Sequence, residues 1–207
     1  MKLKIPEKQS DIKIYTYLEY EKFIKGLNDN QKKDEDYLLF NTLYIFYGID
    51  NETYKKLPYN TTMELYEIVT TLLNTKQELV QRFKVKGIEF GLVPNMDDIT
   101  LAELVDLDTT DIVRQLCILY RPITNKKKDK YLVELYKADL QYYDEFKELG
   151  LNIMNGFVGF FLNIQKDFMA YTLNSLEEVE GLNPRQKKDL EKSGSGILGF
   201  LNSVTGI

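Results

Sequence analysis

The chain has 207 residues, of which 43% are hydrophobic and 29% are charged, and its formal net charge at pH 7 is −5. This composition is typical of a folded protein with a core of its own. The acidic balance argues against a protein that wraps nucleic acid over its whole surface, because such proteins carry a broad basic face. Histidine is absent, which excludes catalytic triads and zinc sites that need a histidine.

Cysteine use and hydropathy set the expected compartment. Cys117 is the only cysteine, so no disulfide can form within the chain and nothing indicates an oxidising environment. The segment Met1–Pro6 is not followed by an apolar stretch of the signal-peptide kind, and no run reaches the roughly 18 apolar residues of a membrane span. We therefore expect synthesis in the cytoplasm.

The first third of the chain is predicted to be mainly helical. Ile12 and Ile14 alternate with polar residues, which predicts a short strand. Apolar spacings then predict helices over 17–27, 36–47, 52–57 and about 61–73. The segment 36–47 is apolar on nearly every side, which is typical of a buried helix, and Gly48 is a natural stop.

In the middle of the chain the spacing of apolar residues changes from the three-to-four-residue period of a helix to the two-residue period of a strand. Apolar and charged residues alternate over 83–90 on both sides of Gly87, which predicts a hairpin. Thr100 and Glu103 have the spacing of a capping box. A helix over 111–120 should stop at Pro122, and 131–136 should form a third strand. Lys126–Lys128 between them are interpreted as a solvated loop, with phosphate contact as the alternative.

One long helix is predicted over about 150–179. Its apolar residues, including Phe157 and Phe160, follow steps of three and four, as in a coiled-coil seam. Gly156 and Gly159 would allow another backbone to approach closely. The seam could pack in the core of its own chain or against another subunit, and both interpretations stay open here.

The C-terminal arm, 181–207, is apolar after a glycine- and serine-rich stretch at 193–196. An apolar segment of this kind is expected to dock on its own core or on a partner. The partner-binding hypothesis covers both regions: Ile153, Phe157, Phe160, Phe161, Ile164, Phe168, Ile197, Leu198, Phe200 and Leu201.

The predicted fold class is therefore α+β and mainly helical. A helical N-terminal part precedes a small hairpin or three-stranded antiparallel unit at about 80–137, and the long helix and apolar tail follow. Residues 1–180 are expected to form a single helix-rich domain and 181–207 an arm.

With no histidine and one cysteine, the chain has carboxylates as its main candidates for metal ligands or catalytic groups. Five aspartates lie close in sequence and could hold a divalent cation, although several fit helix starts equally well: Asp97, Asp98, Asp106, Asp108 and Asp111. Arg121 is expected to pair with one of them. Cys117, beside Leu116 and Ile118, is interpreted as a small buried hydrophobe. No catalytic residue and no cofactor is predicted; a metal-dependent enzyme on these carboxylates is the alternative.

The central sequence carries a resemblance to a known group of proteins. Phe83-Lys-Val-Lys-Gly-Ile-Glu-Phe-Gly-Leu-Val-Pro94, then Leu104-Val-Asp-Leu-Asp108 and Ile118-Leu-Tyr-Arg-Pro-Ile123, resemble virion and assembly proteins of tailed bacteriophages. The likeness is to crAss-like phages of Bacteroidetes hosts and covers about 80–136. It implies a virion or assembly protein that acts through protein contacts. Contacts with itself as a ring and with portal or tail proteins are the partners expected of a connector subunit. Passive contact with DNA in a channel is a further implication.

Among roles in such a particle, a subunit of the head–tail connector is the expectation that the aromatic helix and docking tail favour. A tail-assembly chaperone and a cargo protein of the capsid are the alternatives. The resemblance places the protein in the virion and carries over no catalytic residue.

Overall fold

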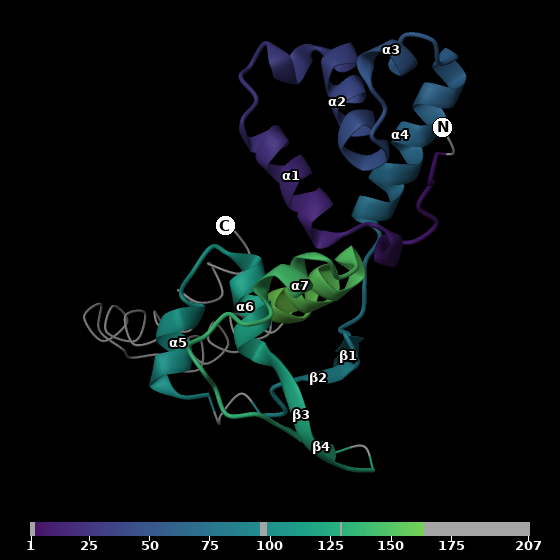
Figure 1. Ribbon diagram of the computed structural model, residues 1–207. Coiled ribbons are helices and arrows are strands. Elements are labelled where there is room, and N and C mark those ends of the chain that lie inside the picture. Colours follow the sequence, from purple (N-terminus) through teal and green to yellow (C-terminus); the bar gives the residue numbers. More distant parts are fainter. Residues whose placement is uncertain (1–2, 96–98, 129, 164–207) are drawn as a thin grey trace, which may run out of the picture. The chain divides into compact units, whose positions relative to one another are not determined.

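The computed structural model describes residues 3–95, 99–128 and 130–163, and it is mainly helical with one sheet (Figure 1). The contacts divide it into two compact units. The first unit is Met1–Gln77 with Lys147–Ile153, and the second is Glu78–Phe146 with the chain from Met154 onward. The α+β class is confirmed. The single domain over 1–180 reaches beyond the described residues and stays a prediction.

The first unit contains helices and short 3-10 turns. Its elements are η1 (Gln9–Asp11), α1 (Ile14–Lys25), η2 (Gln31–Lys33), α2 (Glu35–Tyr47), α3 (Asn51–Tyr54) and α4 (Tyr59–Asn74). The predicted strand at Ile12 and Ile14 is wrong, because Ile14 is the first residue of α1. Only an isolated bridge, Lys13 with Gly150, forms there. Both isoleucines are buried, so their apolar character reflects the core and not a strand face.

Helix α2 shows how far an apolar pattern can mislead. Its start is capped by the Asp34 side chain, which accepts from the Tyr37 amide, and it ends at Gly48 in the left-handed region (φ 66°), as predicted. The prediction of burial on every side is wrong. Leu43 and Tyr47 enter a core with Leu65 and Val69 of α4, whereas Tyr44 is 52% exposed. The neighbouring helices of this unit cover only part of α2.

The N-terminal segment is tied to the end of α4 by one buried side chain. Gln9 is 2% exposed, and its side-chain amide donates to the carbonyls of Leu72 and, at 2.7 Å, Thr75. Carbonyls in the last turn of a helix have no partner within the helix. Gln9 therefore satisfies the end of α4 from a distant part of the sequence.

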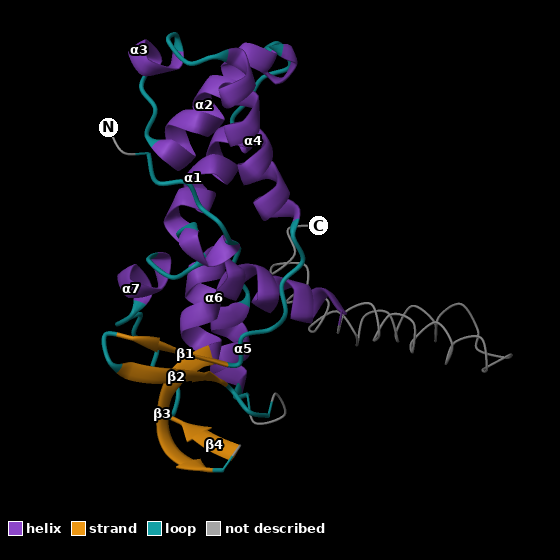
Figure 2. Ribbon diagram, turned by 90° about the vertical axis from the view of Figure 1, so that its right-hand side faces the viewer, coloured by secondary structure: helices purple, strands orange, loops and turns teal. Residues whose placement is uncertain are grey.

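The second unit is built on a four-stranded antiparallel sheet in the order β1-β2-β3-β4 (Figure 2). Its elements are β1 (Arg82–Val85), β2 (Ile88–Leu92), α5 (Leu101–Leu107), α6 (Ile112–Leu119), β3 (Tyr120–Lys127), β4 (Lys130–Val133) and α7 (Tyr143–Lys147), followed by a helix over 151–163. The β1–β2 hairpin is confirmed, with Val85 opposite Ile88 and a turn at Lys86 and Gly87.

The prediction of three strands is wrong, and the missing strand is β3. Helix α6 passes into β3 with no connecting residue, because α6 ends at Leu119 and β3 begins at Tyr120. Pro122 disfavours helical backbone for Arg121 and so promotes an extended chain. Lys126 and Lys127, predicted in a loop, are the last residues of β3, with Lys127 opposite Lys130.

The core of the second unit is aromatic. Phe83, Phe90 and Phe146 pack with ring centroids 5.2 to 5.8 Å apart. Tyr120 lies 5.0 Å from the Phe83 ring and 6.1 Å from Phe157 on the C-terminal helix. This cluster fixes the sheet against the helix, so the sheet has one buried face and one outer face.

Gly156 brings the C-terminal helix against another backbone segment, as its sequence position predicted. A Cβ atom at Gly156 would lie 2.2 Å from the carbonyl oxygen of Glu78. The described part of this helix ends at residue 163, so the rest of the predicted helix to 179 and the tail at 181–207 lie outside the described residues. Within the described residues, no helix is long and apolar enough to cross a membrane.

Candidate protein-interaction surface

Helix α5 has its apolar side turned outward. Leu101 is 78% exposed, Leu104 42% and Val105 67%, and their spacing places them on one side of the helix. The opposite side carries Glu103, 2% exposed, and Leu107, which is fully buried. A surface helix normally shows the reverse arrangement, with charge outward and apolar residues inward. We call Leu101, Leu104 and Val105 the α5 face.

Each oxygen of the buried Glu103 carboxylate has a close partner. One carboxylate oxygen, Oε1, forms an ion pair with Nη2 of Arg121 at 3.0 Å. The other, Oε2, accepts from the Thr100 amide at 2.7 Å and from the Thr100 hydroxyl at 2.6 Å. The capping box predicted from the sequence is thus confirmed. Arg121 does pair with a carboxylate, but with Glu103 of the capping box and not with one of the aspartates.

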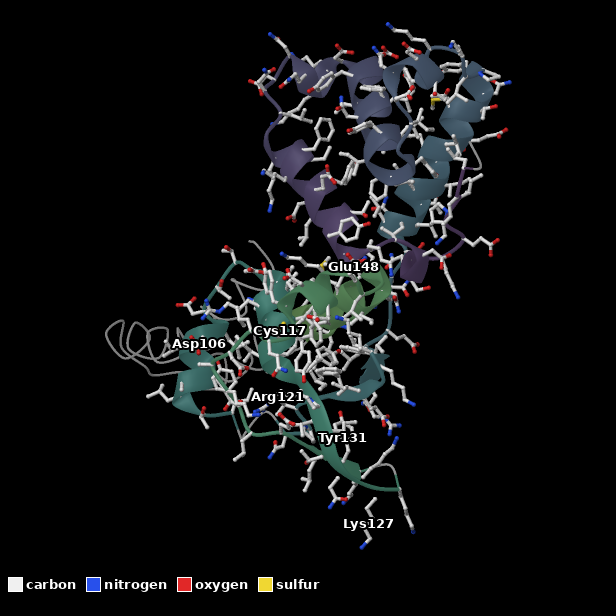
Figure 3. The ribbon with its side chains drawn as sticks, viewed as in Figure 1. Asp106, Cys117, Arg121, Lys127, Tyr131 and Glu148 are labelled. Carbon is white, nitrogen blue, oxygen red and sulfur yellow. The ribbon has the colours of Figure 1, made fainter. Side chains whose placement is uncertain are left out.

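Two of the aspartates around α5 and α6 also have partners, Asp106 (labelled in Figure 3) and Asp111. Asp106 forms an ion pair with Arg114 at 3.0 Å and accepts from the Tyr136 hydroxyl. Asp111 caps α6 by accepting from the amides of Val113 and Arg114, and it accepts from the Tyr143 hydroxyl at 2.6 Å. These bonds hold α5 and α6 in place from several sides.

The tyrosine hydroxyls in this network keep their protons. Burial, and then the hydrogen bond to Asp106, raise the pKa of Tyr136 to about 12. Burial and the bond to Asp111 raise the pKa of Tyr143 to about 12 as well. Both hydroxyls therefore remain hydrogen-bond donors at neutral pH.

The described residues give little support to the alternative of a metal-dependent enzyme. Among the described residues, no group of three or more histidine, cysteine, aspartate or glutamate side chains could hold a metal ion. Asp106 and Asp111 are engaged as above, and Asp97 and Asp98 lie outside the described residues.

Cys117 is half-buried, whereas the sequence predicted full burial. Burial, followed by the charge of Asp111, raises the pKa of its thiol to about 12, so the reactive thiolate is not formed at neutral pH. The thiol and Arg121 border a cavity of about 40 Å³. Small-molecule sites typically enclose roughly 300 to 1,000 Å³, so this cavity suits water and not a substrate.

The predicted partner-binding residues divide into buried and undescribed ones. Ile153 is 7% exposed, Phe157 is fully buried and Phe161 is 3% exposed, whereas Phe160 is half-buried. The described part of the seam therefore packs inside its own chain. The remaining six predicted residues lie outside the described residues: Ile164, Phe168, Ile197, Leu198, Phe200 and Leu201.

Sequence reasoning missed the α5 face. The spacing of Leu101, Leu104 and Val105 was readable as one side of a helix, but it does not reveal which side is buried. Glu103 is the residue that could have shown which side is buried. A glutamate that bonds the N-cap residue and pairs with an arginine can face the interior of the protein.

Comparisons with protein-family models, with curated proteins and with solved structures gave no match to this chain.

Proposed function

We propose that this chain is a structural subunit of a tailed-phage virion, a ring component of the head–tail connector, and that it works through protein–protein contacts. The resemblance over residues 80–136 supports a tailed-phage particle, and the aromatic helix and apolar tail predicted from the sequence favour the connector role within it. The outward α5 face supports the mode of action, because a helix that presents aliphatic side chains to solvent gains free energy when another protein covers it.

The α5 face is the observation that carries the proposal. Fully burying a leucine or valine contributes about 1.5 to 3 kcal/mol, and the face offers three such side chains. The ion pairs of Glu103 and Asp106 fix α5 before any partner arrives. A pre-organised face loses little conformational entropy on binding, so most of the burial energy is available for association.

Two substitutions on this face should prevent self-association. We expect Leu101→Ser with Val105→Ser to shift the chain toward the monomer in sedimentation velocity, weakening association at least tenfold, because both side chains are more than 60% exposed in the single chain. The matched control is Leu132→Ser with Leu135→Ser, which removes two exposed leucines elsewhere (62% and 88%) and should leave association unchanged.

Equal loss of association in both double variants would contradict the assignment of the interface to α5. A wild-type chain that stays monomeric at every concentration would contradict self-association altogether. Circular dichroism of each variant checks that the helical content is intact.

The apolar tail gives a second expectation for assembly. If the tail docks on a partner and not on its own core, removing residues 196–207 should weaken association while leaving the thermal midpoint of the remaining chain within a few degrees. Sedimentation and a thermal melt of the same sample provide the two readouts. A truncated chain that no longer folds would mean that these residues belong to its own core.

A further inference from the structure

We propose that one end of the sheet in the second unit binds the phosphate backbone of duplex DNA. The strands and turns over 82–92 and 120–133 carry eight lysines and arginines against two acidic residues, although the whole chain has a net charge of −5. Positive charge is thus concentrated on one small part of an acidic protein. Such a local field attracts a polyanion even where the net charge would repel it.

The strand register gathers this charge at one end of the sheet. Val85 faces Ile88 across the first turn, and Phe90 faces Pro122, so β3 runs from Pro122 toward the side of the β1–β2 turn. The second turn follows Lys127, and Figure 3 shows Lys127 at the far end of this hairpin, beyond Tyr131. Both turns therefore lie at the same end. We call Lys84, Lys86, Lys126, Lys127, Lys128 and Lys130 the basic tip.

Half of the basic tip has no acidic partner among the described residues. Lys86 pairs with Glu145 at 2.8 Å and Lys126 with Glu89 at 3.0 Å. The hydrogen bond from Lys126 lowers the pKa of the Glu89 carboxylate, and Lys84, which lies opposite Glu89 across β1 and β2, helps to lower it. The other three, Lys127, Lys128 and Lys130, are exposed and form no ion pair with a described residue. Three ammonium groups around one hairpin turn, without an ion pair to a described residue, match the repeating charges of a nucleic-acid backbone.

Both hairpin turns carry a lysine in a backbone conformation that lysine adopts less readily than glycine or asparagine. Lys86 (φ 47°) and Lys128 (φ 56°) are the non-glycine residues with left-handed backbone in the described chain, and each occupies a hairpin turn. Asparagine or glycine would be more stable there. Lys127 also faces Lys130 directly across the hairpin, a like-charge pair that destabilises a sheet. Lys86 gains its ion pair with Glu145 in return, whereas no described ion pair compensates Lys127, Lys128 or Lys130, and residues that break local rules without compensation point to a function.

The remaining side chains favour phosphates over unstacked bases as the ligand. The Tyr131 ring covers Gly91, where a Cβ atom would lie 2.4 Å from the ring, and its hydroxyl donates to the Leu92 carbonyl at 2.7 Å. The Arg82 guanidinium lies 5.8 Å from the centre of the same ring. Because this ring is already packed, the tip presents charge and no free aromatic platform for a single-stranded base.

A labelled 20-base-pair duplex and fluorescence anisotropy test this inference. We expect the wild-type chain to bind, with the logarithm of affinity falling against the logarithm of salt concentration with a slope of roughly −2.7, for three lysines at about 0.9 each. Lys127→Gln, Lys128→Gln and Lys130→Gln together should weaken binding at least tenfold in 50 mM NaCl. The control with equal charge loss, Lys32→Gln, Lys33→Gln and Lys55→Gln, should bind within twofold of the wild type.

Three results would overturn the inference: no binding at 50 mM NaCl, equal loss in both triple variants, or binding to anionic phosphatidylserine vesicles without binding to the duplex. Thermal melts should show that the tip variant is at least as stable as the wild type, since the substitutions remove the like-charge pair of Lys127 and Lys130. The inference does not depend on self-association. If the chain is monomeric and binds the duplex, the proposed connector ring is wrong, whereas the proposed DNA contact of the basic tip is retained.

Discussion

Arg121→Met is expected to lower the free energy of unfolding by about 3 to 5 kcal/mol, which is the usual cost of removing one partner of a buried ion pair. Without Arg121, whose side chain is 12% exposed, the Glu103 carboxylate would remain 2% exposed with no cation beside it. Urea denaturation followed by far-ultraviolet circular dichroism measures the change. The same variant should loosen α5 and so weaken self-association.

An exposed ion pair provides the control. Lys126 and Glu89 are 3.0 Å apart, but their side chains are 44% and 30% exposed, so Lys126→Met should change stability by less than about 1 kcal/mol. Replacing both buried partners, with Glu103→Leu and Arg121→Met, should recover part of the loss because no unpaired charge is left. A single Arg121→Met variant as stable as the wild type would show that the pair does not hold α5.

Gly156→Ala is expected to destabilise the second unit by about 2 kcal/mol. The new methyl group would lie 2.2 Å from the carbonyl oxygen of Glu78 and 2.9 Å from its carbon, and neither atom belongs to a side chain that could rotate away. Overpacking of this kind costs about 1 to 3 kcal/mol and can cost more against backbone. The gain in helix propensity, about 1 kcal/mol, offsets only part of it.

Gly26→Ala is the matched control for this substitution. Gly26 has ordinary right-handed backbone (φ −81°), and the nearest atom to a Cβ atom there is 3.3 Å away. Its replacement should therefore change stability by less than about 1 kcal/mol. If Gly156→Ala proves as stable as the wild type or more so, the close approach of the C-terminal helix to residues 78–79 is wrong.

Local chemistry explains which parts of the fold the sequence could predict. The turn at Gly87, the cap pair Thr100 and Glu103, and the stop at Gly48 each depend on neighbouring residues, and each is present. Gly156 was also correctly interpreted, because glycine in an aromatic helix has few other uses.

Features that depend on distant contacts were missed. Strand β3 follows α6 without a turn and contains Pro122, which is rare inside a sheet, so the sequence favoured a helix stop and a loop. The exposed side of α2 and the outward face of α5 are set by which neighbours cover them. An apolar spacing identifies a side of a helix but carries no information about what lies against it.

The mass of the native assembly tests the central claim most directly. In native mass spectrometry of the purified 24.3 kDa chain at micromolar concentration, we expect one dominant species with a fixed number of subunits larger than two, as a closed ring requires. The Leu101→Ser and Val105→Ser double variant should then give the monomer mass. A wild-type spectrum with only the 24.3 kDa species would contradict the proposed ring subunit.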